Sequence, residues 1–308
     1  MNFELSTLHD WAAQVRAGNR LAIARAITAV ESGGESSLAL LRVLFQAGRR
    51  AEIIGVTGAP GVGKSTLVDK LARLYRGEGL RLGILSVDPS SPFSGGALLG
   101  DRIRMQSLSA DPEVYIRSMA TRGNLGGLSA ATQDAVTVLE AAGCAVVLVE
   151  TVGVGQDEVE VAGLADITLL LLAPGAGDSV QALKAGVMEI ADVLVINKAD
   201  YPGATRAEQE IAAVLSLRPD AGEWKPPIVK TVASTGEGVQ DVRRKIEDFR
   251  AFGEANGLQE RREREKCRSR LLALTRQRLF EKFVRPRLAD PRLDQAVDRV
   301  LRREQDPH

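Results

Sequence analysis

Residues 58–65 constrain the fold of this chain more than any other segment. They read Gly-Ala-Pro-Gly-Val-Gly-Lys-Ser and fit the spacing G-x-x-x-x-G-K-[ST]. The apolar stretch 51–57 before them is typical of a buried strand, and residues 66–72 after them predict a helix. A strand, a glycine-rich loop and a helix in this order surround phosphate oxygens with backbone N–H groups. The alternative, a glycine-rich turn that happens to hold a lysine, leaves the flanking strand and helix unexplained.

The motif assigns a role to its polar residues. Lys64 is expected to reach the β- and γ-phosphates of a nucleotide and to act in catalysis, and the Ser65 hydroxyl is expected to bind Mg²⁺. The expected ligands are therefore a nucleoside triphosphate and Mg²⁺. The predicted phosphate-binding residues are Gly58, Ala59, Pro60, Gly61, Val62, Gly63, Lys64, Ser65 and Thr66.

Short apolar segments alternate with helical segments from residue 51 to about residue 250. The predicted strands are 51–57, 81–87, 113–117, 145–150, 167–172, 193–196 and 227–232. The predicted helices include 128–142, 179–190, 205–216 and 238–250. This alternation predicts an α/β fold, the three-layer αβα arrangement of P-loop NTPases with a mostly parallel sheet. Ligands of such sheets bind beyond the carboxyl ends of the strands.

The two ends of the chain differ from this central region. Residues 1–50 lack strand signals and predict an N-terminal helical segment, residues 51–252 the nucleotide-binding domain, and residues 253–308 a helical C-terminal segment. In the last of these, Pro286 is expected to end a charged helix, and Asp290 with Pro291 to start another. The C-terminal segment either folds back onto the main domain or reaches a second subunit, and the pattern alone favours neither.

Composition argues against several classes of protein. Lys plus Arg and Asp plus Glu both number 40, so the zero net charge argues against a partner that is nucleic acid or a membrane surface. The first residues lack the basic-then-apolar order of a secretion signal, so none is expected, and the longest apolar run, 167–173, is too short to cross a bilayer. Two cysteines, Cys144 and Cys267, form no disulfide framework. These features predict a cytoplasmic protein.

A second motif concerns the nucleotide base. Asn197-Lys198-Ala199-Asp200 directly follows the predicted strand 193–196. The Asp200 carboxylate can accept hydrogen bonds from the ring N–H and the exocyclic amine of guanine, whereas adenine has no such donor pair at that edge. Asn197 is expected to contact the opposite edge of the base and to tie loops together, and the stem of Lys198 to cover one ring face. The motif therefore favours GTP over ATP. The last predicted base-contacting loop contains Ser234, Thr235 and Gly236.

Acidic residues between these motifs are candidate Mg²⁺ ligands. Asp88 and Glu150 each end a predicted strand, and Asp101 lies in a loop rich in serine and glycine. Together with Ser65, these three residues form the predicted metal set. Most GTPases carry aspartate at the place of Glu150, so the longer side chain predicts an outer-shell or shifted metal contact. Asp101 has a simpler alternative role as a surface or helix-capping residue.

The group that orients the attacking water is harder to predict. Gly153, three residues after Glu150, is expected to offer its N–H to the γ-phosphate. In Ras-like enzymes a glutamine follows this glycine, but here the position holds Val154. Gln156 and Asp88 are the nearby candidates, so the predicted catalytic residues are Lys64, Asp88, Glu150 and Gln156. Slow intrinsic hydrolysis that a partner accelerates is expected.

Five further segments, taken in order with the phosphate loop, resemble the MeaB/ArgK family. The segments are 87–91, 100–105, 121–127, 150–156 and 173–178. The resemblance covers nearly the whole chain. Members of the family are GTPases that accompany cobalamin-dependent acyl-CoA mutases such as methylmalonyl-CoA mutase. The resemblance implies a P-loop GTPase core, an N-terminal helical segment and a C-terminal dimerisation arm, and therefore a homodimer.

The resemblance also implies a biological role. GTP binding and hydrolysis would gate delivery of adenosylcobalamin to the mutase and protect or reactivate it. Residues 173–184 would form an extra switch loop, with Asp178 and Lys184 as its polar contacts. Asp178 has the alternative role of a helix cap.

Other functions share the same scaffold. A small-molecule kinase or a transport-associated NTPase of the ArgK type is the main alternative, although Asp200 argues against both. A binding module that uses nucleotide only as a switch is another. A nickel-insertion GTPase would need a cluster of soft ligands, but the chain has only His9, His308, Cys144 and Cys267, widely separated in sequence.

Overall fold

The computed structural model describes residues 5–46, 49–89, 106–121, 127–151, 156–175, 187–216, 224–288 and 290–306. The chain divides into two compact units, residues 1–263 and 264–308. The first unit holds the sheet and most of the helices, and the second is helical. The sequence boundaries at residues 50 and 252 stay a prediction.

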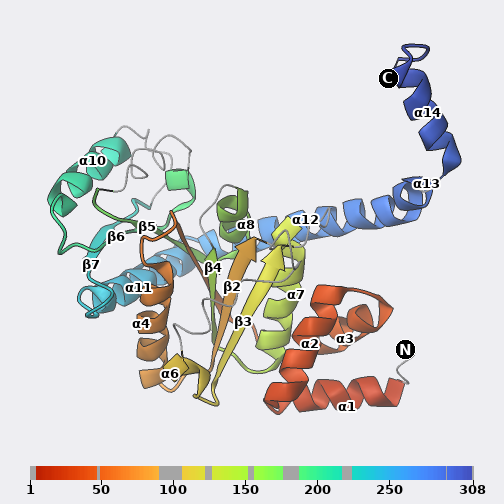
Figure 1. Cartoon of the computed structure of the whole chain (residues 1–308). Coiled ribbons are helices and arrows are strands. Elements are labelled where there is room, and N and C mark those ends of the chain that lie inside the picture. The colour runs from red at the N-terminus through yellow and green to blue at the C-terminus, as the bar shows by residue number, and fades with distance from the viewer. Residues whose placement is uncertain are drawn as a thin grey trace. The chain divides into compact units, whose positions relative to one another are not determined.

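The first unit contains a seven-stranded parallel sheet in the order β3-β2-β4-β1-β5-β6-β7 (Figure 1). The strands are β1 (Glu52–Gly58), β2 (Leu82–Pro89), β3 (Val114–Thr121), β4 (Val146–Thr151), β5 (Ile167–Leu172), β6 (Val193–Asn197) and β7 (Ile228–Thr231). All seven overlap the strands expected from the sequence. The prediction of a three-layer α/β fold is confirmed. Because every strand runs the same way, the carboxyl ends of β1, β4 and β6 meet at one edge.

Helices cover both faces of this sheet (Figure 1). One face packs against α4 (Lys64–Gly77) and α11 (Val239–Ala255), with Ile54, Leu67 and Val242 in one buried cluster. The other face packs against α7 (Gly127–Ala141) and α8 (Gln156–Leu164), and beyond them the N-terminal helices α1 (Leu5–Arg16), α2 (Arg20–Ser32) and α3 (Glu35–Phe45). The other helical elements of this unit are the short α6 (Gln106–Ser109) and η1 (Val187–Ile190) and the longer α10 (Ala204–Ser216).

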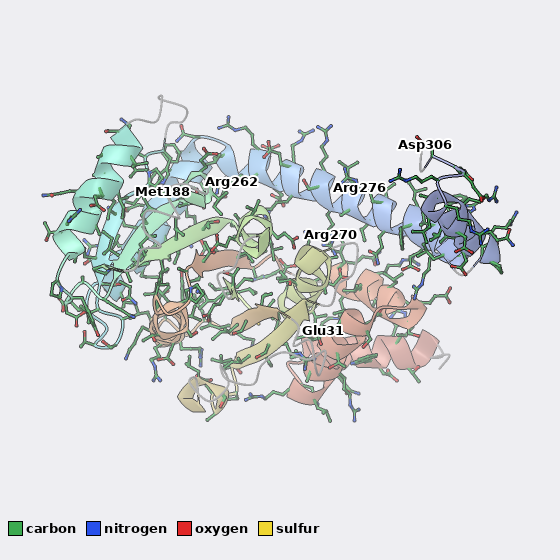
Figure 2. All side chains as sticks on the ribbon, turned by 45° about the horizontal axis from the view of Figure 1, so that its top comes forward. Glu31, Met188, Arg262, Arg270, Arg276 and Asp306 are labelled. Atoms are coloured by element: carbon green, nitrogen blue, oxygen red, sulfur yellow. The ribbon has the colours of Figure 1, made fainter. Side chains whose placement is uncertain are left out.

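The N-terminal helices are tied to the edge strand β3 by polar contacts. Arg117 of β3 forms an ion pair with Glu31 at the end of α2, a residue labelled in Figure 2. The Tyr115 hydroxyl donates to the carbonyl oxygen of Gly18 at 2.9 Å. The Asn19 side chain caps α2 by accepting a hydrogen bond from the Ala22 N–H. The contacts of Arg117 and Tyr115 hold the predicted helical segment against the sheet domain, whereas the Asn19 cap fixes the start of α2.

The start of α12 (Leu258–Leu279) is anchored beside the amino-terminal end of β6. Arg262 (Figure 2) forms a two-point ion pair with Asp192, the residue before β6, at 2.7 and 2.9 Å. Its guanidinium also lies 5.0 Å from the centre of the Phe249 ring. Since Asp192 is buried, this pairing stabilises its charge, and loss of Arg262 would leave an uncompensated carboxylate.

The second unit continues through η2 (Phe280–Val284), α13 (Arg285–Leu288) and α14 (Pro291–Leu301). Pro286 does not end the helix as expected, because α13 extends two residues beyond it. The wider π-helical turn of η2 lies directly before the proline, where a normal turn would clash with the proline ring. Asp290 caps α14 by accepting from the Arg292 N–H, so the second expected helix start is confirmed. Within the described residues, no helix has the length and apolar character needed to cross a membrane.

Candidate nucleotide-binding site

The phosphate loop joins β1 to α4 and depends on two glycines. Gly58 has φ +138°, and a Cβ there would lie 2.2 Å from the carbonyl oxygen of Leu171 on β5. Gly63 has φ +98°, and its Cβ would lie 2.3 Å from Nδ2 of Asn197. Both positions require a conformation and a clearance that only glycine supplies. The second also brings the phosphate loop into contact with the predicted base-reading motif.

Lys64 lies under this loop at the first position of α4. Its side chain is buried and donates hydrogen bonds from Nζ to the carbonyl oxygens of Gly58 at 2.7 Å and Ala59 at 2.9 Å. A cation at the N-terminal end of a helix is disfavoured by the helix dipole. Bound phosphates would reverse that cost, since they place negative charge beside both the ammonium group and the helix end.

We expect Gly63→Ala to destabilise the fold by about 1–3 kcal/mol, because alanine is strained at this φ and displaces the Asn197 amide. Urea unfolding measures the change, and GDP titration should show weaker binding. Gly77→Ala is the matched control, since Gly77 has no positive φ and open space around its Cβ position. Equal stability of the Gly63 and Gly77 variants would contradict this reading of the loop.

Ser65 and Glu150 meet beside the phosphate loop. The Ser65 hydroxyl donates to Oε1 of Glu150 at 2.6 Å, and Glu150 is buried at the end of β4. A hydroxyl that donates its proton to a carboxylate keeps its lone pairs for a metal ion. A serine oxygen beside a carboxylate is the hard oxygen chemistry that Mg²⁺ prefers. These two residues fit the metal role predicted for them.

The other predicted metal ligands are only partly described. Asp88 lies near the carboxyl end of β2, where its backbone pairs in register with Ala120 of β3, and its side chain lies outside the description. Asp101 lies outside the described residues altogether. The backbone places Asp88 at the same sheet edge as Ser65 and Glu150.

Asn197 connects three segments of the site. Its Nδ2 donates to the carbonyl oxygen of Val62 in the phosphate loop at 2.7 Å. Its Oδ1 accepts from the Thr231 hydroxyl and from the N–H of Ala233, each at 3.0 Å. These three hydrogen bonds of the buried side chain all go to the protein. These contacts tie the phosphate loop to the loop after β7, as expected of Asn197, and its contact with the base stays a prediction.

The remaining base-reading residues lie on two adjacent turns. Lys198 has φ +58° and donates from Nζ to the carbonyl oxygen of Gly61 at 2.7 Å, so its stem spans the gap between the two motifs. Asp200 is exposed in the turn after β6. The N–H of Ala199 donates to the carbonyl oxygen of Thr231, which places this turn beside the loop that contains Ser234, Thr235 and Gly236. The base-reading motif therefore lies next to the phosphate loop, through Lys198, and next to the loop after β7, through Ala199.

Residues 23–287 match the family described as methylmalonyl Co-A mutase-associated GTPase MeaB. The chain belongs to the MeaB family. A Pyrococcus horikoshii protein named "Putative GTPase" is 51% identical over 247 residues, which cover 79% of this chain and 78% of that protein. The methylmalonic aciduria type A homolog of Mus musculus, a mitochondrial protein, is 38% identical over 250 residues, 75% of this chain and 60% of that protein. The predicted family and the GTPase class are confirmed.

A solved structure also resembles this MeaB-family chain in fold. The crystal structure of an LAO/AO transport system kinase matches with a TM-score of 0.74 and 28% identity, over 100% of this chain and 96% of that one. This likeness confirms the P-loop NTPase fold.

Several predicted site residues of this MeaB-family chain lie outside the description. Gly153, Asp178 and Lys184 belong to segments that the structure does not describe, and Gln156 begins α8 with an undescribed side chain. Their roles stay predictions. Cys144 is buried before β4, and burial raises the pKa of its thiol to about 12. A thiol that stays protonated is a poor metal ligand, which agrees with setting aside the nickel alternative.

Sequence reasoning missed three hydroxyl residues that support the site. Thr231 holds Asn197, and the Thr151 hydroxyl donates to Oγ1 of Thr57 at 3.1 Å between β4 and β1. Threonine is common in strands, so nothing in the sequence distinguishes these residues from ordinary strand positions. Only their places at the carboxyl ends of neighbouring strands indicate their role.

Proposed function

We propose that this chain is a Mg²⁺-dependent GTPase that serves a cobalamin-dependent acyl-CoA mutase. GTP binding and hydrolysis would gate delivery of adenosylcobalamin to the mutase and protect or reactivate it. The nucleotide part of the proposal is carried by one observation, the bridge that Asn197 makes between Val62 of the phosphate loop and Ala233 of the predicted base loop. The mutase part is supported by the family match over residues 23–287. The cytoplasmic location stays a prediction.

Each proposed site residue has a task in binding or hydrolysis. Lys64 binds the β- and γ-phosphates, and the backbone of residues 58–66 surrounds them. Asp200 accepts hydrogen bonds from guanine, with Lys198 against the ring and residues 234–236 beside it. Gly153 donates its N–H to the γ-phosphate. Gln156 or Asp88 orients the attacking water, and both lie at the carboxyl edge of the sheet.

Ser65, Asp88, Asp101 and Glu150 would hold Mg²⁺. The proposal is supported by the hydrogen bond between Ser65 and Glu150, which prepares a hydroxyl and a carboxylate as oxygen ligands. A bound Mg²⁺ neutralises charge on the β- and γ-phosphate oxygens. Glu150 holds the Ser65 hydroxyl in position, and Ser65 lies at the start of α4, where the phosphates would be bound.

The nucleotide state would reach the mutase through the switch loop that includes Asp178 and Lys184. This loop begins where β5 ends, at the same sheet edge as the phosphate loop. We expect the chain to retain a methylmalonyl-CoA mutase more strongly with a non-hydrolysable GTP analogue than with GDP. Co-purification of the two proteins under both conditions measures this. Equal retention in both states would contradict the switch, and the absence of any complex would contradict the mutase assignment.

A homodimer is part of the proposal. In the second unit, large apolar side chains are exposed along α12, η2, α13 and α14: Leu271, Leu272, Leu279, Phe283, Leu288, Leu293, Val297 and Leu301. Such a run of exposed apolar residues is typical of a surface that another chain covers. Sedimentation velocity should give twice the mass of one chain, and a monomer at micromolar concentration would contradict the proposal.

A small-molecule kinase is the alternative, since the solved neighbour is named as a transport system kinase. Incubation with γ-labelled GTP and candidate acceptors such as arginine separates the two functions. The GTPase proposal expects label only in inorganic phosphate, and release should rise when mutase is added. A labelled acceptor would support the kinase instead.

A further inference from the structure

A row of polar side chains crosses the sheet beside the Ser65–Glu150 pair. Ser86 of β2 pairs in register with Glu150 of β4 on one side and with Ser118 of β3 on the other. Residues paired across parallel strands point to the same face, with the strands about 4.8 Å apart. The row of Ser118, Ser86 and Glu150 therefore lies on one face of the sheet.

This face is the one covered by α4. Ile84 on β2 and Leu148 on β4, each two residues before a member of the row, belong to the same buried cluster as Leu67 of α4. Because side chains alternate along a strand, Ser86 and Glu150 share that face. The row therefore lies next to the apolar core, on the side of the carboxyl ends of the strands, and Glu150 at its end contacts the Ser65 hydroxyl.

The Ser86 hydroxyl has an unusual environment. Its side chain is 1% exposed, and among the described residues its Oγ has no hydrogen-bond partner. The Oγ of Ser118 is likewise buried without a partner in the described part of the chain. A buried hydroxyl without a partner costs folding free energy, whereas alanine would fill nearly the same space without that cost. The position is more easily explained by a state of the protein in which the hydroxyl is used.

We propose that Ser86 is a positioning residue that donates a hydrogen bond to the Glu150 carboxylate when the metal site is loaded. The inference rests on the proposed Mg²⁺ site. In this structure Oε1 of Glu150 accepts from Ser65. When the Ser65 oxygen and the carboxylate turn toward a cation, the Ser86 hydroxyl becomes the fixed donor beside the carboxylate. Ser118 can in turn donate to the Ser86 oxygen, which keeps the Ser86 proton directed at Glu150.

Ser86→Ala tests this role by removing only the hydroxyl. The concentration of Mg²⁺ that half-restores tight binding of a fluorescent GDP should rise roughly 10-fold, as for the loss of an outer partner of a metal ligand. The melting temperature without Mg²⁺ should stay the same or increase, because an unpartnered buried hydroxyl is lost. A purely structural role would instead lower the melting temperature and leave the Mg²⁺ response unchanged.

Thr132→Val is the matched control. Thr132 on α7 is also 1% exposed, and its hydroxyl also lacks a partner among the described residues, but it lies on a helix that packs against the other face of the sheet. This variant should match Ser86→Ala in metal-free stability and wild type in its Mg²⁺ response. If Ser86→Ala responds to Mg²⁺ as wild type does, the inference about Ser86 is wrong and the proposed metal site is unaffected. If the GDP affinity of the wild-type protein does not depend on Mg²⁺, both the proposed metal site and the inference about Ser86 are wrong.

Discussion

Lys64→Ala should weaken GTP binding roughly 100- to 1,000-fold, because it would remove the charge-assisted hydrogen bonds that we propose Lys64 makes to phosphate oxygens. The side chain is buried at the N-terminal end of α4 and is held by the carbonyl oxygens of Gly58 and Ala59. Among the described residues, Lys198 also reaches this loop, where its Nζ donates to the carbonyl oxygen of Gly61. Isothermal titration with a non-hydrolysable GTP analogue measures the loss.

Lys70→Ala provides the control for this variant. Lys70 lies on the same helix, partly exposed and more than one turn beyond the phosphate loop. Its replacement should leave GTP affinity within about twofold of wild type, since it changes only long-range charge that salt screens. Wild-type affinity in Lys64→Ala, with circular dichroism unchanged, would show that the triphosphate binds elsewhere.

Asp200→Asn should reduce affinity for GDP at least about 100-fold and increase affinity for the xanthine nucleotide. In the proposed site, the carboxylate would accept from both the ring N–H and the amine of guanine. An amide can accept from the same ring N–H but donates at its second position, where xanthine carries a carbonyl oxygen. Asp200 is exposed in the turn after β6, so the substitution should leave the fold unchanged.

Competition between GDP and xanthosine diphosphate for a fluorescent nucleotide measures this exchange of preference. Asp241→Asn, an exposed position in the first turn of α11, controls for the loss of one negative charge. A guanine preference that survives in Asp200→Asn would show that another group reads the base. The Asp241 variant should retain the guanine preference in full.

Much of the fold follows from local patterns. Each strand is a short apolar run bounded by turn residues, and all seven were predictable because burial on both faces of a parallel sheet needs continuous apolar sequence. The phosphate loop was equally clear, since its glycine spacing encodes a backbone shape. Pro286 was misjudged, because a widened helical turn before the proline removes the clash that normally ends a helix. The sequence also suggested that Asn197 ties loops together, but which loops it joins became clear only from its contacts with Val62 and Ala233.

The sequence by itself determined the elements, their order and the residue types of the site, because periodicity and short motifs are local properties of the chain. Tertiary structure alone brought Glu150 to Ser65 across 85 residues and Asn197 to Val62 across 135. It also aligned Ser86 with Glu150, although each strand alone shows only a serine or a glutamate among apolar residues. Such contacts depend on the order β3-β2-β4-β1-β5-β6-β7 in which the strands pair. That order is fixed by packing between distant segments, so no single stretch of sequence contains it.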